Sequence, residues 1–465
     1  MSVTRAKFWI YSIWIWLLSL YLLCLLSPVT LEPIDAHANL PTIKITLNGR
    51  PTMVTSQMAI GATHEHSDAD SQNNTEAVAS AKQLMQTALV YQNQQIMGWG
   101  AEDPEPSPGR YNWDSLDERV QLMRNTHAQM VLTLCCAPGW MRPQGYQDDW
   151  KDLEVAPDPS HIQDFADLTA QVALRYPDVK YFQVWNELKG MWSNSPGATP
   201  GISNLNRWDY ERYTALYNAV YDAIKQVRPD AQIGGPYVVM DSDGNKSVMS
   251  DPGPSYSWGT LDQRPLDVLT YWLTHKHGAD FITIDGSSSN KDGVWLTNEF
   301  AAARKFVDIY NWIRSQPGDG TALPIWWAEW YADYPSSAPQ NLDYYNAVMA
   351  SAEIYTAMSG ASVILIWQPQ GDAQGLSYPE GIWTDTSRPR GGKPTPYYYT
   401  SAAIKHYFGP GTHLYKPTLS SSNITVIASA QEMMLVSHLP IQQDAIVDGQ
   451  TITLSPYQVL VTATV

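Results

Sequence analysis

The chain has 465 residues, of which 44% are hydrophobic and 16% charged, and it carries a formal net charge of -17. This length accommodates one large domain and a small accessory one, and the composition is typical of an ordered globular protein. The acidic excess argues against a nucleic-acid partner, because binding to phosphate backbones requires clustered Lys and Arg.

The N-terminus combines positive charge with a long apolar stretch. Arg5 and Lys7 precede the stretch 8–26, which is close to the length of a membrane span. We interpret residues 1–38 as a signal anchor or signal peptide. The sequence Ala36-His37-Ala38 matches a cleavage pattern but lies far from the apolar stretch, so cleavage stays open. We expect the rest of the protein outside the cytoplasm, membrane-anchored or secreted, with membrane contact through this segment only.

After residue 38, short apolar runs alternate with longer segments of helical period, a pattern typical of parallel strands joined by crossover helices. We count eight such units. Their predicted strands are Met58–Ala62, Gln95–Gly98, Met130–Leu134, Tyr181–Trp185, Gln232–Gly234, Phe281–Ile284, Ile325–Ala328 and Val363–Trp367. Eight units favour a closed (β/α)8 TIM barrel, in the α/β class, over an open doubly wound sheet. We assign the barrel to residues 53–408.

Several helices of these units are marked in the sequence. The clearest runs from Tyr210 to Val227, with apolar residues at steps of three and four, and ends before Pro229. Others are expected to begin at the capping residues Asp114 and Ser160.

Two adjacent cysteines follow the third predicted strand. Cys135 and Cys136 end an apolar run, and adjacent cysteines bridge only with strain. We therefore expect both to be small buried hydrophobic residues rather than part of a disulfide.

Beyond Phe408 the pattern changes to short alternating runs separated by turn residues. The predicted strands are Ile424–Ile427, Met433–Val436, Gln450–Leu454 and Val459–Val465. We predict a small all-β sandwich at residues 409–465. So short a segment makes a thin sandwich, so we expect the strand-like Thr42–Leu47, within the segment 39–52, to complete it.

Two glutamates close two of the barrel strands. Glu187 ends the fourth, after Val184-Trp185-Asn186, and Glu329 ends the seventh, after Trp326-Trp327-Ala328. A carboxylate at the end of an apolar strand loses hydration without gaining apolar contacts, so packing does not explain it. Glycosidic cleavage does, because it needs one protonated and one ionised carboxyl group, about 5 Å apart in a retaining enzyme.

These two motifs resemble those of glycoside hydrolase clan A. Within the clan, the chain is most similar to family thirty-nine, which contains β-xylosidases, α-L-iduronidases and bacterial exopolysaccharide hydrolases. The loop Pro108–Trp113 followed by Leu116-Asp117, the strand end Ile233–Pro236 and the β-rich tail are also similar to that family. The resemblance covers roughly residues 40–465.

The resemblance implies a retaining glycoside hydrolase that cleaves a poly- or oligosaccharide without a cofactor. It assigns Glu187 as the general acid/base and Glu329 as the nucleophile. It also places Asn186 at the sugar 2-hydroxyl and Trp367 at the floor of the subsite.

The sixth strand departs from the family pattern. The family usually has a histidine or tyrosine there, whereas this chain has Asp285. Asp285 can bind a sugar hydroxyl or a cationic amino sugar, or it can be a structural acid that caps the next helix. Substrate identity is therefore open.

Other residues after strand ends are candidates for sugar contact. They are His64 and the aromatic residues Trp140, Trp192 and Tyr331. The chain is biased towards such rings, with 19 Trp and 27 Tyr against 7 Phe; packing in the core is the alternative for each. A metal site at His64-Glu65-His66 is disfavoured, because a third ligand is not evident.

Two other functions remain possible from the sequence. A clan A endo-β-glucanase or mannanase would share both glutamates. A catalytically inactive carbohydrate-binding barrel is the second, although it leaves the glutamates unexplained. Both alternatives keep a carbohydrate as the partner.

Overall fold

The structure is a computed structural model that describes residues 40–47, 54–64, 75–318, 322–371 and 381–464. One compact unit spans Thr42–Val465. The predicted apolar stretch 8–26 lies outside the described residues. Within the ranges that are described, no helix is both long and apolar enough to cross a membrane.

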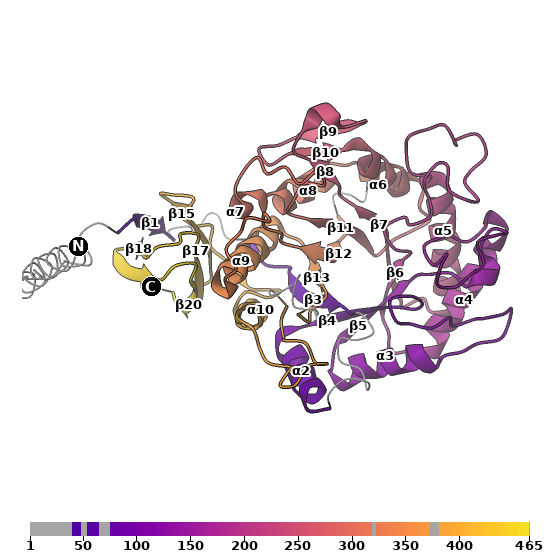
Figure 1. Ribbon diagram of the computed structural model, residues 1–465, viewed down its shortest axis with the longest axis horizontal. Coiled ribbons are helices and arrows are strands. Elements are labelled where there is room, and N and C mark those ends of the chain that lie inside the picture. Colours follow the sequence, from indigo (N-terminus) through magenta and orange to yellow (C-terminus); the bar gives the residue numbers. More distant parts are fainter. Residues whose placement is uncertain (1–39, 48–53, 65–74, 319–321, 372–380, 465) are drawn as a thin grey trace, which may run out of the picture. The chain divides into compact units, whose positions relative to one another are not determined.

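Eight parallel strands close into a barrel, which confirms the predicted fold class (Figure 1). Neighbours in the barrel follow chain order, and the last strand pairs with the first. The strands are β3 (Ala59–Thr63), β4 (Tyr91–Gln95), β5 (Gln129–Leu134), β6 (Tyr181–Val184), β7 (Gln232–Val239), β11 (Phe281–Ser287), β12 (Ile325–Tyr331) and β13 (Val363–Trp367).

A long helix follows each barrel strand and covers the outside of the barrel (Figure 1). These helices are α2 (Thr75–Ala88), α3 (Asp114–Asn125), α4 (Ile162–Arg175), α5 (Tyr210–Val227), α6 (Gln263–His275), α8 (Lys305–Arg314), α9 (Leu342–Ser359) and α10 (Pro396–Tyr407), with the short α7 (Glu299–Ala302) before α8. The predicted bounds of α5 are confirmed.

The predicted caps of α3 and α4 are wrong. Asp114 is the first residue of α3, and its own N–H is bound by the side chain of Asn112. Ser160 lies in a short 3-10 helix ahead of α4, where Asp158 accepts its N–H. In both places a residue two positions earlier already provides the oxygen, so the turn forms before the expected cap.

The predicted second strand is displaced along the chain. We expected Gln95–Gly98, whereas β4 comprises Tyr91–Gln95. The strand carries four successive amide side chains, and all four are buried. An apolar pattern could not locate it, because this strand brings polar groups into the barrel interior.

The barrel interior is layered. Its N-terminal end is filled by aromatic rings, with Phe281 stacked on Trp326 at 4.2 Å between ring centroids. A polar layer follows, in which Asn93 donates to Thr63 at 3.1 Å and accepts from Thr133 at 2.9 Å. Because these buried polar groups satisfy one another, the strands stay in fixed register beneath the C-terminal mouth.

Cys135 and Cys136 follow β5 and are fully buried, as expected. Their sulfur atoms, however, are joined in a disulfide, so the expectation of two free thiols was wrong. Sequence reasoning treated the strain of an adjacent pair as decisive against a bridge.

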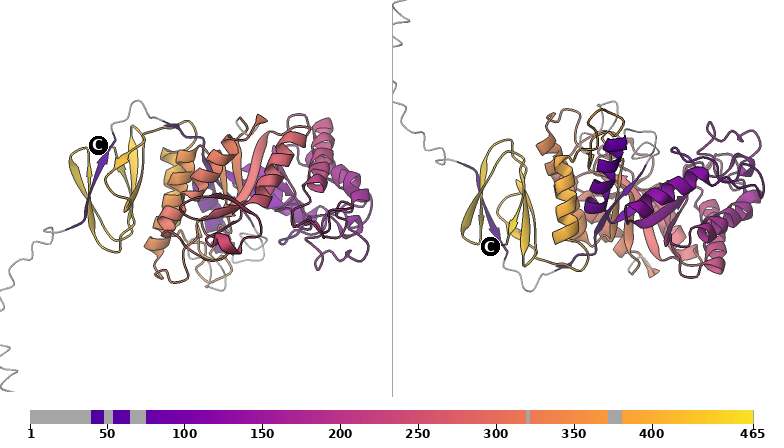
Figure 2. Two further views of the ribbon diagram at one scale, coloured as in Figure 1. Left: turned by 90° about the horizontal axis from the view of Figure 1, so that it is seen from above. Right: turned by 90° about the horizontal axis from the view of Figure 1, so that it is seen from below.

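The C-terminal strands form two small sheets (Figure 2). One has the order β15-β1-β18-β19 and the other β16-β17-β20. Their bounds are β15 (Thr418–Leu419), β1 (Thr42–Thr46), β18 (Gln443–Val447), β19 (Gln450–Leu454), β16 (Ile424–Ala428), β17 (Glu432–Ser437) and β20 (Val459–Ala463). The N-terminal strand β1 runs parallel to β18 and antiparallel to β15.

The second of these sheets packs against helix α9 of the barrel (Figure 2). His438 follows β17 and lies in this contact, stacked on Phe300 at 4.0 Å between ring centroids. Its Nε2 lies 2.8 Å from the Thr425 hydroxyl and 3.3 Å from that of Ser351 on α9. Burial lowers the pKa of His438 to about 4.

Candidate functional site

Glu187 follows β6 at the C-terminal mouth of the barrel. The chain bends sharply there: Trp185, Glu187 and Leu188 have left-handed backbones with φ of 69°, 51° and 51°. Each such residue costs about 1–3 kcal/mol, so the surrounding packing must impose the bend. The bend leaves the Glu187 side chain 21% exposed, whereas Trp185 and Leu188 are buried.

Glu329 lies within β12 and is almost entirely buried, with 4% exposure. Its Oε1 accepts hydrogen bonds from the Tyr237 hydroxyl at 2.7 Å and from Asn186 Nδ2 at 3.3 Å. Its Oε2 accepts from the Tyr331 hydroxyl at 2.6 Å. Burial and the charge of Glu187 raise its pKa to about 7, while both tyrosine hydrogen bonds oppose that rise.

Asp285 is the third carboxyl group of the site. It lies in β11 and is the Cα neighbour of Glu329 in β12, just past an irregularity in the pairing of these strands. One carboxyl oxygen from each of Glu187, Asp285 and Glu329 can be chosen so that all three lie within 4.8 Å of one another. Glu187 and Glu329, predicted from two distant motifs, therefore meet at one place.

Burial raises the pKa of Asp285 well above its usual range, and the charges of Glu329 and Glu187 raise it further. A hydrogen bond with Glu187 acts in the same direction. These effects favour the protonated form of Asp285, because a third negative charge in this buried place has little compensation.

Lys189 provides the positive charge of the site. Its Nζ lies 2.5 Å from Glu187 Oε2 and 3.4 Å from Glu154 Oε1. Burial by itself would lower the pKa of Lys189, but the two glutamates outweigh burial and raise it. The ammonium group stays charged and fixes the Glu187 carboxyl group on one side.

The other predicted residues fall into two groups. Asn186 and Tyr331 contact Glu329 directly, as described above. His64 and Trp367 lie at the same edge of the barrel, because β3 pairs with β13 and Trp367 is the partner of Thr63. The His64 side chain is fully buried, and Trp367 is half-buried.

Trp140 and Trp192 are held by other loops. Trp140 donates from Nε1 to the Glu105 carbonyl at 2.8 Å and contacts His161 edge to face. Trp192 packs edge to face on Trp208 at 4.8 Å, and the Arg264 guanidinium lies 5.3 Å from its ring centroid. Among the described contacts, neither ring touches the three carboxyl groups.

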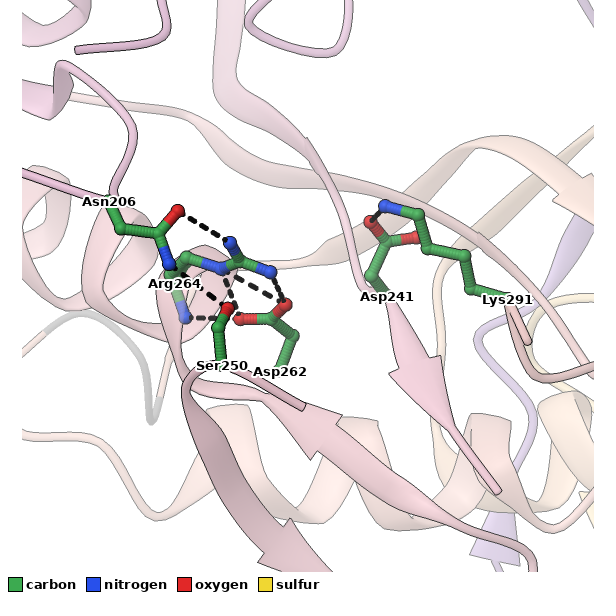
Figure 3. Close-up of polar contacts among 6 residues, drawn as sticks. All are labelled: Asn206, Asp241, Ser250, Asp262, Arg264 and Lys291. Atoms are coloured by element: carbon green, nitrogen blue, oxygen red, sulfur yellow. Dashed lines mark hydrogen bonds and ion pairs between the residues drawn. The ribbon is translucent and has the colours of Figure 1, made fainter. Parts of the chain in front are cut away.

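The position of Trp192 depends on an insertion after β7. The insertion forms a small sheet of β8 (Ser242–Asp243), β9 (Pro252–Ser255) and β10 (Thr260–Asp262). Figure 3 shows Arg264 paired with Asp262 and contacting Asn206, which in turn donates to Ser250 at 3.0 Å. These contacts join the loop after β6 to the insertion. Nearby, Lys291 pairs with Asp241 at 2.9 Å (Figure 3).

Sequence reasoning missed two residues of this site, Tyr237 and Lys189. Tyr237 directly follows the Gly-Gly-Pro strand end that suggested the family, and its place at the end of a barrel strand could have identified it. Lys189 lies only two residues after Glu187, but sequence proximity did not reveal that the chain turns back and pairs them.

Among the described residues, these three carboxyl groups also form the cluster of metal-ligand side chains that lie close enough together to hold one cation. Such an all-carboxylate set would suit a hard cation such as Ca²⁺. Lys189 neutralises part of this negative charge through its ion pair with Glu187.

No family model matches the chain, and no curated protein sequence matches it. Solved structures do. A monomeric β-xylosidase from Caulobacter crescentus has a TM-score of 0.55 at 15% identity, over 85% of this chain and 76% of that one. The GH39 enzyme from Xanthomonas axonopodis pv. citri has a TM-score of 0.53 at 15% identity, over 87% and 76%. A conserved exported protein from Bacteroides fragilis has a TM-score of 0.58 at 13% identity, over 90% and 98%.

At these identities the likeness establishes a shared fold. The chain shares the barrel fold of these solved structures, among them a β-xylosidase and a GH39 enzyme, so the resemblance noted in the sequence is confirmed for the fold. The activity of this protein must be argued from its own carboxyl groups.

Proposed function

We propose that this protein is a retaining glycoside hydrolase that cleaves a poly- or oligosaccharide. One observation carries the proposal: Glu187 and Glu329 come from opposite parts of the barrel and present carboxyl oxygens within 4.8 Å of each other. Retaining enzymes hold their two carboxyl groups about 5–5.5 Å apart, and carboxyl oxygens this close together support such an arrangement.

Glu329 would act as the nucleophile. It would attack the anomeric carbon as the glycosidic bond breaks, while Glu187 gives a proton to the departing oxygen. Water then attacks the same carbon, gives its proton to Glu187 and releases Glu329. The hydrogen bonds from Tyr237 and Tyr331 favour the ionised form of Glu329 that this attack requires.

The exposure of the two glutamates supports this division of roles. Glu187 is partly exposed and can reach a leaving group and then water. Glu329 is enclosed, with both oxygens held by donors. We assign Asn186 to the sugar 2-hydroxyl, Trp367 to the floor of the subsite, and His64, Trp140, Trp192 and Tyr331 to the surrounding sugar contacts.

A panel of aryl β-glycosides tests the proposal. We expect turnover of at least one of them, with NMR showing that the first sugar product has the configuration of the substrate. Inverted product would contradict the retaining mechanism. Absence of turnover together with retained oligosaccharide binding would favour an inactive carbohydrate-binding barrel. Product sizes from polysaccharides would separate exo from endo action.

The proposed location follows from the N-terminal segment. Positive charge before the apolar stretch 8–26 predicts an extracytoplasmic, membrane-attached or secreted enzyme. Fractionation of the native cell should recover the full-length protein with membranes or outside the cell. Recovery in the soluble cytosol would contradict the assignment.

A further inference from the structure

The site contains one carboxyl group more than double displacement uses. Asp285 is 1% exposed, and its oxygen Oδ2 has no hydrogen-bond donor within reach in the described part of the chain. A carboxyl oxygen of Asp285 nevertheless lies within 4.8 Å of both Glu187 and Glu329, where the sugar must be held. Asp285 is therefore buried, lacks a hydrogen-bond partner at Oδ2 among the described residues, and has a carboxyl oxygen close to both glutamates.

The positive charge near the site does not form an ion pair with Asp285 among the described contacts. Among the described residues, Lys189 is the cation that acts on both Asp285 and Glu329, and its ammonium is already paired with Glu187 and Glu154. An ionised Asp285 would need a cation of its own, because a buried carboxylate without a partner is costly. That cation can arrive with the substrate.

We propose that Asp285 binds the ammonium group of an amino sugar, so that the substrate is a glycan with free amino groups. This inference rests on the proposed glycosidase function and names its substrate class. Carbon 2 of the sugar is next to the anomeric carbon that the two glutamates act on, which favours a 2-amino-2-deoxy sugar. Its amino group would take the place of the 2-hydroxyl assigned above to Asn186. The net charge of -17 would also attract a polycationic glycan.

Amine binding would also prepare the general acid. Asp285 and Glu187 share a hydrogen bond that raises the pKa of Asp285 and so favours its protonated form. A bound ammonium would favour the ionised form of Asp285, so the proton of this hydrogen bond would pass from Asp285 to Glu187, where the departing oxygen needs it. A neutral sugar, or one whose amine is acetylated, brings no charge to drive this transfer.

Kinetics on matched substrates tests the inference. The probes are 4-nitrophenyl β-glycosides of glucosamine, N-acetylglucosamine and glucose, with the corresponding galacto series, at a pH that keeps the amine protonated. In one series we expect kcat/KM for the free amine to exceed that of both partners by about tenfold or more, as for one charge-assisted hydrogen bond. The preference should fade at higher pH as the amine loses its proton.

Asp285→Asn keeps the shape of the side chain and removes its charge. We expect the ratio of kcat/KM between amino and neutral glycosides to fall towards one in this variant. Asp222→Asn removes an equal charge from the exposed face of α5 and should keep the wild-type ratio. Persistence of the amine preference in Asp285→Asn would overturn the assignment to Asp285, with thermal unfolding confirming that the variant is folded.

Binding separates this inference from the proposed function. Calorimetry on the wild-type protein compares glucosamine with glucose, and galactosamine with galactose. Amine-selective binding without turnover would support the amine site while contradicting the glycosidase. Turnover of neutral or N-acetylated glycosides at rates equal to or above those of the amines, in both series, would overturn the amine site and leave the glycosidase standing. The wild-type measurements decide the matter even if Asp285→Asn does not fold.

Discussion

Single side chains set the charge state of Glu329. Its pKa of about 7 is the outcome of burial and the neighbouring Glu187, which raise it, and of two tyrosine hydroxyls, which lower it. The nucleophilic role proposed for Glu329 requires its ionised form, so kcat/KM should rise with pH through the pKa of Glu329 in the free protein. The acid limb of the pH profile is therefore expected near neutral pH.

Tyr237→Phe should move this acid limb. Loss of the 2.7 Å hydrogen bond removes a stabilising contact from the ionised form of Glu329, so its pKa rises. We expect the limb to shift upward by about one pH unit or more, as for one hydrogen bond to a charged group. Tyr399→Phe, at a 63% exposed position, is the control and should keep the wild-type profile. A shift towards lower pH in Tyr237→Phe would contradict this account.

The roles of the two glutamates can be separated by azide. Glu329→Ala should abolish turnover of every substrate, and azide bound in the cavity should give a glycosyl azide of inverted configuration. Glu187→Ala should still react with activated aryl glycosides, whose leaving groups need little protonation, and azide should give a product of retained configuration. The anomeric configuration is read by NMR. The opposite pairing of variants and configurations would show that the roles are exchanged.

The sequence was sufficient to place Glu187 and Glu329 in one site, because a charge that ends an apolar strand is a strong local signal. It did not reveal Lys189 or Tyr237. Their contacts depend on left-handed backbones at Glu187, Leu188 and Tyr237, and a linear pattern does not predict such backbones at residues other than glycine.

At the scale of elements, the apolar pattern predicted seven barrel strands at the correct places and displaced the second. β4 consists largely of amide side chains that face other polar groups, such as Arg119 Nη1 bound to Gln94 Oε1 at 2.8 Å. A hydropathy pattern detects strands whose buried side chains are apolar. It misses a strand whose buried side chains are mostly amides, of which Gln92, Asn93 and Gln94 are held by hydrogen bonds.

Helix α5 depends on a cap that also fixes the loop after β6. Asp209 is fully buried and accepts hydrogen bonds from the Arg212 N–H at 3.1 Å and from the Thr199 N–H at 2.7 Å and hydroxyl at 2.9 Å. Asp209→Ala should lower the free energy of unfolding by about 1–3 kcal/mol, because buried donors lose their acceptor. Denaturant unfolding measures this. Gln226→Ala, an exposed substitution on the same helix, should change stability by less than about 0.5 kcal/mol.

At the scale of the whole molecule, the contact between the β16-β17-β20 sheet and α9 includes a buried neutral histidine. The folded pKa of His438, about 4, lies below its unfolded value of about 6.5. Between these values the unfolded chain binds the proton and the folded protein does not. Stability therefore decreases as pH falls through this window, by about 3 kcal/mol in total.

His438→Gln should remove that dependence. We expect the difference in unfolding free energy between wild type and variant to change by about 3 kcal/mol between pH 7 and pH 4, in the direction that favours the variant at low pH. Denaturant titrations at several pH values measure the difference and cancel the contributions of other buried acids, such as Glu353. A difference that stays constant with pH would show that His438 does not titrate in this window.

The pairing of β1 with β15 and β18 constrains the order in which the protein can be completed. Thr42 is matched with Asp444, so this strand leaves the ribosome long before either of its partners exists. The barrel strands lie between them in the chain and can close first. During that interval β1 carries two unpaired edges and the apolar side chains Ile43 and Ile45, which are buried only in the finished protein. A newly made chain therefore passes through a stage in which the barrel can be closed while β1 is still unpaired and can associate with other molecules. That stage ends only when the last sixty or so residues have been made.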